Sequence, residues 1–327
     1  MVQRAAAAQP LVEGRGRCYL GIMSLAVVHH PAFSAPMPRS HRFPMGKFAR
    51  LMRVLLEDGV VSPGMVHVPE PAPRRWLDLA HDPGYVDDIL TQTLDPAAER
   101  RIGLPISPDV ALRSRAAVAG TLLTARLALE RGIACNTAGG SHHAFEAYGS
   151  GFCVFNDVAV AARVLLAEGA IGQALVVDLD VHQGDGTASI FAHEPRVFTF
   201  SMHCRTNFPA RKQRSDLDLA LDPDLEDDAY LRLLGEHLPG LLDDVRPDLV
   251  FFNAGVDPHG DDRLGRLSLS ERGLWARETL VFETCLRRGV AVAGVLGGGY
   301  APDLDQLARL HSIQHRVAGA VLGRLRP

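Results

Sequence analysis

Acidic and imidazole side chains alternate with apolar residues where one strongly apolar segment ends. In the segment DLDVH, Asp178, Asp180 and His182 follow directly on the run ALVV. If this segment is extended, alternate side chains lie on the same face. Polar groups on a buried face need a partner because an unpaired buried charge is costly, and a divalent cation would provide one. The alternative is that DLDVH is a solvated loop or a set of helix N-caps.

A further acidic residue follows another apolar run. Asp257 comes after Asn253-Ala-Gly-Val at the end of DLVFFN, and it could add a metal ligand from a third direction. A site of two carboxylates and one imidazole leaves zinc an open coordination position for water. An open position of this kind is typical of catalytic rather than structural zinc.

Two adjacent histidines follow a pair of glycines in the segment GGSHHA (139–144). Glycine tolerates positive φ, so the pair permits a sharp bend that could turn His142 and His143 toward one pocket. A histidine that is neutral near pH 7 is a natural proton acceptor from a metal-activated water. Asp178 and Asp185 are available to orient the two rings. Most isolated histidine pairs have no such role, and Asp185-Gly could be merely a turn.

The glycine run GGGY (297–300) has two interpretations. Glycines after a strand could cradle a phosphate. However, neither G-x-G-x-x-G nor G-x-x-x-x-G-K-[ST] is present, and Pro302 follows closely. The alternative is that the glycines let the backbone carry Tyr300 into a site, where its hydroxyl would donate to a developing oxyanion.

These four segments all follow expected strands. Strands such as ALVVDLD are continuously apolar, so both of their faces should be buried, and they alternate with helical patterns. This alternation predicts a single α/β domain with a doubly wound, mostly parallel sheet. Ligands of such sheets bind beyond the carboxyl ends of the strands, where the four segments should meet. We expect strands at 18–28, 64–69, 133–136, 174–179, 196–201, 248–253 and 290–296, and helices near 46–58, 83–93, 108–131, 155–168, 226–244, 271–288 and 302–323.

The composition narrows the class of protein. The chain has 327 residues, is 47% hydrophobic and 22% charged, and carries a net charge of −4. It can bury an ample hydrophobic core, and it lacks the excess of basic residues that a nucleic-acid binder would have.

The cysteines and the apolar runs indicate the cellular compartment. The five cysteines contain no C-x-x-C pair, which fits a reducing cytoplasm. No apolar run reaches the roughly 18 residues of a membrane span. The dominance of arginine over lysine suggests a bacterial, GC-rich source. We expect residues 1–17 to be a loose tail and 18–327 to form the catalytic domain.

Taken together, the motifs resemble the zinc-dependent histone deacetylase family, which has an arginase-like α/β fold. The segments HRFPMGKF, DVHQGDG and GDDRLGRLSLS are most similar to the class IV branch and its bacterial members. The resemblance is carried by segments in the family's order: HRFPMGKF (41–48), GGSHHA, GFCVFND (151–157), DLDVHQGDG (178–186), NAGVDPHGDDRLGRLSLS (253–270) and GGGY.

The resemblance also implies a role for individual residues. It implies zinc held by Asp180, His182 and Asp257. It implies a proton-transfer pair, His142 and His143, backed by Asp178 and Asp185, and a carbonyl-polarising Tyr300. It implies a substrate channel that includes Gly151, Phe152, Phe208 and Gly298. It implies a structural potassium ion near Asp178, Asp180, His182, Ser201 and Met202, and it aligns Arg42 with a buried arginine beside an acetate-release cavity.

The implied reaction is metal-dependent removal of an acyl group from N-acyl-lysine or a related small acylated amine, in the cytoplasm and without nucleic acid or membrane. His143, held by Asp185, would take the proton of water, and His142 would be an electrostatic partner, although the two roles could be exchanged. Ferrous iron could replace zinc, and the oligomeric state is open. Ser141 stands where the family commonly has an aromatic residue, which could widen or wet the floor of the site.

Several alternatives remain for the substrate and the class of protein. On the same fold, the chain could be an acetylpolyamine hydrolase or a long-chain deacylase. A two-manganese ureohydrolase is disfavoured because D-x-D-x-H occurs once. An inactive acyl-lysine binding module or a nucleotide-binding protein are further alternatives. The basic stretch Arg211-Lys212-Gln213-Arg214 could face an acidic substrate or could simply be solvated.

Overall fold

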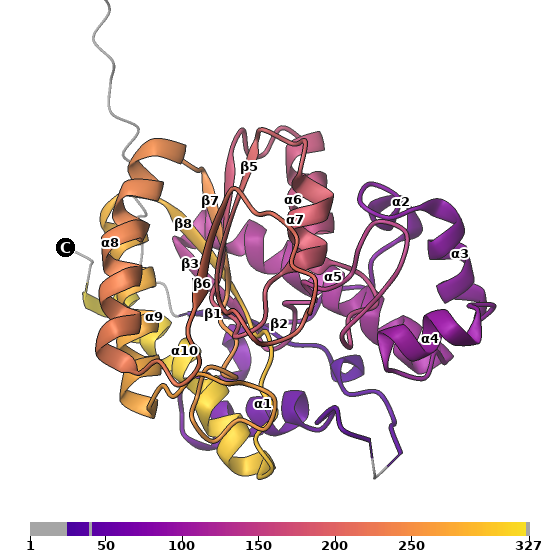
Figure 1. Ribbon diagram of the computed structural model, residues 1–327, viewed down its shortest axis with the longest axis horizontal. Helices are drawn as coiled ribbons and strands as arrows, with labels where there is room; N and C mark the ends of the chain where they lie inside the picture. Colours follow the sequence, from indigo (N-terminus) through magenta and orange to yellow (C-terminus); the bar gives the residue numbers. More distant parts are fainter. Residues whose placement is uncertain (1–24, 39–40, 325–327) are drawn as a thin grey trace, which may run out of the picture.

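The computed structural model describes residues 25–38 and 41–324. Its strands form one sheet of eight strands in the order β2-β1-β3-β8-β7-β4-β5-β6, and every pair of neighbours is parallel. The expected mostly parallel sheet is therefore confirmed and is entirely parallel in the described residues (Figure 1). The strands are β1 (Ala26–Val28), β2 (Val66–His67), β3 (Ile133–Asn136), β4 (Ala174–Asp178), β5 (Val197–Cys204), β6 (Leu217–Leu221), β7 (Leu249–Asn253) and β8 (Ala291–Val295).

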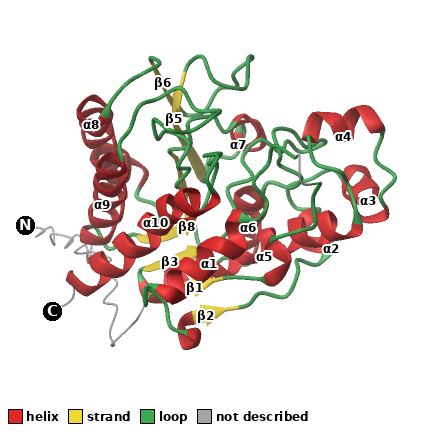
Figure 2. Cartoon of the chain, turned by 90° about the horizontal axis from the view of Figure 1, so that it is seen from below, coloured by secondary structure: helices red, strands yellow, loops and turns green. Residues whose placement is uncertain are grey.

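Helices cover both faces of this sheet (Figures 1 and 2). Helices α1, α8, α9 and α10 pack against one another on one face, and α5, α6 and α7 lie on the other. None of the described helices combines the length and the apolar content that crossing a bilayer requires. The helices are α1 (Lys47–Glu57), α2 (Arg74–Leu77), α3 (Pro83–Thr91), α4 (Pro96–Ile102), α5 (Pro108–Arg131), α6 (Asp157–Ala167), α7 (Asp185–Phe191), α8 (Asp227–Val245), α9 (Glu271–Arg287) and α10 (Leu304–Arg324).

The four central strands explain the continuously apolar segments of the sequence. Every residue of β3, β4, β7 and β8 is buried, because helices cover both faces of the sheet. The loops that follow these strands leave the sheet at the same edge, since the strands are parallel neighbours. This edge is where the sequence places its polar segments.

Some elements differ from the sequence expectations. Strand β6 was not expected, because it is an edge strand whose LDLAL sequence is only partly buried. Helices α2, α4 and α7 are also additional, and they are too short for a helical period to show in the sequence. Of the expected strand 18–28, only β1 lies within the described residues. The expected tail, 1–17, lies outside them.

Candidate active site

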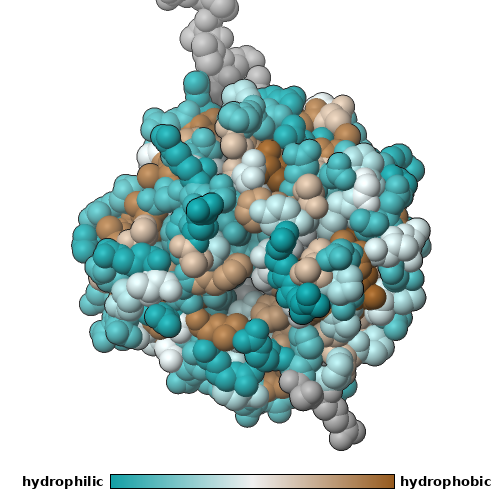
Figure 3. Space-filling view, turned by 45° about the vertical axis from the view of Figure 1, so that its right-hand side comes forward, coloured by the Kyte–Doolittle hydropathy of each residue, from teal (hydrophilic) through white to brown (hydrophobic). Residues whose placement is uncertain are grey.

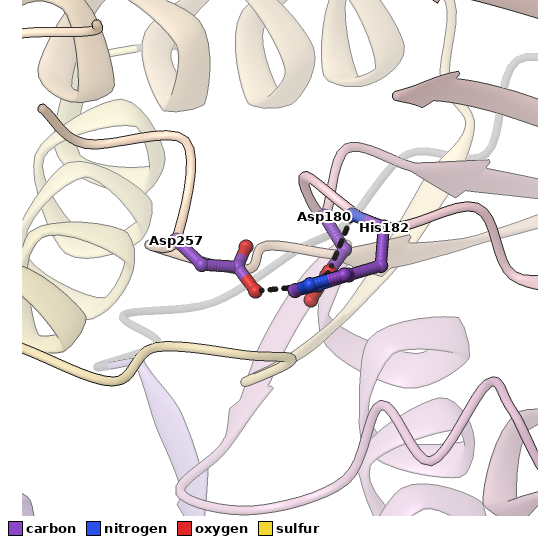
Figure 4. A group of neighbouring side chains, drawn as sticks. All are labelled: Asp180, His182 and Asp257. Atoms are coloured by element: carbon purple, nitrogen blue, oxygen red, sulfur yellow. Dashed lines mark hydrogen bonds and ion pairs between the residues drawn. The ribbon is translucent and has the colours of Figure 1, made fainter. Parts of the chain in front are cut away.

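Three buried side chains from two loops converge at the carboxyl edge of the sheet. Asp180 and His182 follow β4, and Asp257 follows β7. One ligand atom of each lies within 4.8 Å of the others. His182 Nδ1 is 3.0 Å from Asp180 Oδ1 and 3.1 Å from Asp257 Oδ2. Figure 4 shows both carboxylates and the imidazole pointing toward one another.

The chemistry of this group fits a divalent cation. Burial, together with the charge of Asp180, raises the pKa of Asp257 to about 7. The carboxylates of Asp180 and Asp257 are both buried and offer oxygen atoms within 4.8 Å of each other, so their negative charges repel. A cation between them would remove that repulsion. The surrounding backbone also approaches closely: a Cβ added at Gly298 would overlap the carboxylates of Asp180 and Asp257. Carboxylate oxygens and imidazole nitrogens are established ligands of zinc.

The histidine pair lies beside this group, and the two glycines before it adopt the expected backbone. Gly139 and Gly140 have φ values of 85° and 84°, which glycine adopts without strain. The rings of His142 and His143 are 4.1 Å apart between centroids. The bend therefore brings both rings into one site.

Each histidine ring is paired with its own carboxylate. His142 Nδ1 lies 2.7 Å from Asp178 Oδ2, and His143 Nδ1 lies 2.6 Å from Asp185 Oδ1. Asp185 is the first residue of α7 rather than part of a turn. These contacts fix the orientation of both rings and leave Nε2 as the remaining nitrogen of each.

The two histidines differ in their protonation. Burial alone would lower the pKa of His142, but the charges of Asp178 and Asp180 outweigh it and raise that pKa to about 9. For His143, burial and the neighbouring His142 charge lower the pKa to about 4. His142 is therefore an imidazolium near pH 7, whereas His143 is neutral and able to accept a proton.

Tyr300 reaches the same site through the glycine run after β8. Its ring centroid lies 6.3 Å from that of His182. Its backbone N–H donates to Asp262 Oδ2 at 2.6 Å, and Arg263 Nε donates to its carbonyl oxygen at 2.9 Å. Burial and the charges of Asp257 and Asp180 raise the pKa of Tyr300 well above its ordinary value. The hydroxyl is therefore protonated and can donate.

A pocket of about 370 Å³ opens above these residues. Its walls include the predicted channel residues Gly151, Phe152 and Phe208, and its floor reaches His143, His182 and Tyr300. The ring of Phe208 meets that of His143 edge-on at 4.8 Å. Figure 3 shows a hollow in the surface that is bordered by both apolar and strongly hydrophilic side chains.

A smaller inner space of about 30 Å³ lies beneath the site. Gly298, expected in the channel, lines this inner space together with Ser141. The alignment of Arg42 with a buried arginine is wrong, because Arg42 is exposed and lines the outer pocket. The buried arginine beside the inner space is Arg113 of α5, whose Nε donates to the Phe33 carbonyl. The side chain of Phe43 is buried, whereas that of the preceding residue, Arg42, is exposed to solvent.

Two buried side chains that hold the site together, Asp157 and Arg277, were missed in the sequence. Asp157 accepts hydrogen bonds from the N–H groups of Gly140 and Ser141, and thereby fixes the loop that bears the histidine pair. Arg277 donates from Nη1 to the carbonyls of Leu179 and Gly255, in the two loops that carry Asp180 and Asp257. Asp157 is the last residue of GFCVFND, one of the segments that carry the family resemblance, so it could have been found from the sequence. Arg277 lies in α9, where no motif marks it.

Two of the predicted potassium ligands, Asp180 and His182, belong to the group that could hold a divalent cation, and Asp178 ends the strand that leads to them. Ser201 of β5 pairs in register with Asp178 of β4, and the adjacent Met202 is fully buried. The hydroxyl oxygen of Ser201 lies 3.0 Å from His203 Nδ1. The potassium site stays a prediction.

Comparison with known proteins identifies the family. The model of the histone deacetylase domain matches residues 41–315. An uncharacterized protein of Picosynechococcus sp. (strain PCC 7002) is 56% identical over 296 residues, which are 90% of this chain and 99% of that protein. Histone deacetylase 2 of Arabidopsis thaliana is 28% identical, with 84% of this chain and 76% of that protein covered.

A solved structure agrees in fold. It is the crystal structure of a histone deacetylase homologue complexed with SAHA, and it aligns with a TM-score of 0.79 at 24% identity, covering 93% of this chain and 86% of that one. The family match extends over all the segments that build the site. The chain therefore belongs to the histone deacetylase family of hydrolytic deacetylases.

Proposed function

We propose that this deacetylase removes acyl groups from the ε-amino group of lysine in a reaction that depends on one divalent metal ion. The observation that carries the proposal is the meeting of the Asp180, His182 and Asp257 group with His143 and Tyr300 in one pocket. A ligand group, a neutral base and a protonated phenol together suit metal-assisted amide hydrolysis. The complete set also argues against an inactive binding module.

Asp180, His182 and Asp257 would hold the metal, with zinc proposed and ferrous iron as the alternative. A divalent cation there would supply Lewis acidity, which polarises the acyl carbonyl and lowers the pKa of water. The carboxylates of this group are also kept in place by backbone donors: Gly298 N–H bonds Asp180 Oδ2 at 2.6 Å, and Val181 N–H bonds Asp257 Oδ1 at 3.0 Å.

The proton steps follow from the two histidines and the tyrosine. His143, oriented by Asp185, accepts a proton from water at Nε2 as the water oxygen adds to the acyl carbon. The hydroxyl of Tyr300 donates to the acyl oxygen as negative charge develops on it. The C–N bond then breaks, and the proton passes from a histidine to the leaving nitrogen. The proton of the new carboxylic acid passes to the amine, so the products are a carboxylate and an ammonium group. His142 contributes positive charge beside the reaction.

The experiment that tests this proposal measures metal content and turnover together. We expect about one divalent ion per chain and hydrolysis of acyl-lysine peptides that stops with a chelator and returns with zinc or ferrous iron. A panel of acetyl-lysine, long-chain acyl-lysine and acetylpolyamine substrates assigns the substrate class. Asp257→Asn should lose the ion, whereas Asp261→Asn, an exposed carboxylate on the same loop, should keep it. Full turnover by the metal-free protein would refute the proposal.

A further inference from the structure

Four exposed arginines surround the mouth of the active-site pocket. They come from three separate segments of the chain: the loop before α1, the last turn of α4 and the loop after β7. No aspartate or glutamate lines this pocket in the described part of the chain. We call these four residues the arginine rim, and they are Arg42, Arg100, Arg101 and Arg266.

The arginine rim carries positive charge that the protein itself does not neutralise. Some exposed arginines elsewhere pair with carboxylates, for example Arg205 with Asp222 and Arg288 with Asp243, whereas others, such as Arg272, have no such partner among the described residues. Within residues 25–38 and 41–324, none of the rim arginines forms an ion pair. The rim therefore presents unpaired cations on a chain whose net charge is −4.

Two acidic residues near the rim in the sequence, Glu99 and Asp262, accept hydrogen bonds from backbone N–H groups. Glu99 directly precedes Arg100, but its Oε2 accepts from the Ile106 N–H at 3.1 Å. Asp262 precedes Arg266 on the same loop, and its carboxylate accepts from the N–H groups of Leu264, Gly265 and Tyr300. These carboxylates hold loops, and neither of them lines the pocket or forms an ion pair with a rim arginine.

Contacts within the fold account for the positions of only some of the rim arginines. Basic residues in the last turn of a helix favour its C-terminal carbonyls, which accounts for a position such as Arg100. Arg101 also lies over the ring of Tyr148, with its guanidinium carbon 4.8 Å from the ring centroid. Arg42 and Arg266 are in loops, where no helix end calls for a cation. Their convergence on one opening is what needs an explanation.

We propose that the arginine rim selects acyl-lysine substrates whose flanking residues are acidic. Guanidinium groups bind carboxylates well, and unpaired charges around a pocket raise the association rate of an oppositely charged ligand. The basic stretch at 211–214, which the sequence offered for this role, does not line the pocket. Lys212 instead donates to the carbonyls of Asn207 and Pro209. This inference rests on the proposed deacylase function and specifies its substrate.

The test compares three peptides of equal length around one acetyl-lysine. Their flanks are Asp and Glu, the isosteric Asn and Gln, or Lys and Arg. For the metal-loaded enzyme we expect kcat/KM of the acidic peptide to exceed that of the neutral one by about tenfold at low ionic strength. The ratio should fall as salt is added, because salt screens exposed charges. The basic peptide should be the poorest substrate.

Variants then locate the preference. In the combined variant Arg42→Gln, Arg100→Gln, Arg101→Gln and Arg266→Gln, the ratio of acidic to neutral kcat/KM should approach one. Arg272→Gln, which removes an exposed arginine of α9 outside this pocket, should leave the ratio unchanged. Because both peptides are measured on the same preparation, the ratio does not depend on the fraction of folded enzyme.

The outcomes separate this inference from the proposed function. Equal turnover of acidic and neutral peptides at every ionic strength would overturn the selectivity of the rim and leave the deacylase function intact. If no peptide is hydrolysed by the metal-loaded protein, the deacylase function fails. Peptide binding, measured by fluorescence anisotropy, would then still decide the charge preference, since equal affinity for the acidic and neutral peptides overturns it.

Discussion

At the scale of single residues, Tyr300 is the group whose contribution is easiest to isolate. Its phenol is buried in the pocket with its pKa raised, so it acts as a neutral hydrogen-bond donor. Tyr300→Phe removes only the hydroxyl. We expect kcat to fall by about 10²–10³-fold, as for the loss of one oxyanion donor. Metal content should stay the same, because Tyr300 is not in the ligand group. Unchanged turnover would remove Tyr300 from the reaction.

The two histidines give a second prediction at this scale, because the charges of Asp178 and Asp180 raise the pKa of His142 while burial and the His142 charge lower the pKa of His143. His143→Gln removes the proposed base, and we expect kcat to fall by about 10²–10⁴-fold, the usual contribution of general acid–base catalysis. The matched variant His142→Gln removes an imidazolium and should cost less. Single-turnover rates, with metal content measured beside them, make the comparison. A larger loss in His142→Gln would exchange the two roles.

At the scale of elements, the glycine run after β8 is held from both sides. Asp262 accepts the Tyr300 N–H, while the buried Lys47 of α1 donates from Nζ to the carbonyls of Gly297 at 3.1 Å and Gly299 at 3.5 Å. These contacts come from segments far apart in the sequence, so the position of the phenol depends on the packing of α1 and of the loop after β7. The loop is fixed by tertiary contacts rather than by its own glycines.

This arrangement predicts that Asp262 acts through Tyr300. Asp262→Asn should weaken the hold on the Tyr300 backbone and lower kcat, since a small misplacement of a reacting group is costly. In the Tyr300→Phe background the same substitution should lower kcat much less, because the hydroxyl that it positions is gone. Kinetics of the two single variants and the double variant complete the cycle. Additive losses in kcat would show that Asp262 acts independently of Tyr300.

The elements also show what can be read from the sequence. Long helices and buried strands carry strong periods or continuous apolar runs, so α5 was expected with its observed bounds, 108–131. The ligand group was visible because Asp180 and His182 alternate after an apolar strand. Arg113 was missed because its place beside the inner space depends on how α5 crosses the sheet. The arginine rim was missed for the same reason, since three separate segments bring it together.

At the scale of the whole molecule, covering the sheet on both faces buries histidines that have no part in the proposed reaction. His81 accepts the Asn156 N–H at Nε2 and is 2% exposed. His315 of α10 is fully buried, and its Nε2 has no partner among the described residues. Burial lowers the pKa of each to about 4 from the ordinary value of 6.5. Both are therefore neutral in the folded protein at pH 6.

These histidines should make the fold sensitive to mild acid. Between pH 6.5 and about 4 the unfolded chain binds protons that the folded protein does not, so the free energy of unfolding falls as the pH is lowered through this range. Each histidine contributes a slope of up to about 1.4 kcal/mol per pH unit. As the pH rises past 6.5 the unfolded histidines also become neutral, and the slope fades over about one further pH unit. Urea unfolding from pH 4.5 to 7.5 measures it.

A substitution assigns part of this slope to one residue. His315→Met introduces an apolar side chain of similar size and removes the titrating group, so its unfolding free energy should fall less steeply with acid, by about 1.4 kcal/mol per pH unit. His193→Gln, which changes a histidine that is exposed rather than buried, is the matched control. Only the difference between the curves is used, which cancels the contribution of the metal-binding group. Parallel curves for His315→Met and the unsubstituted protein would show that His315 is protonated equally in both states.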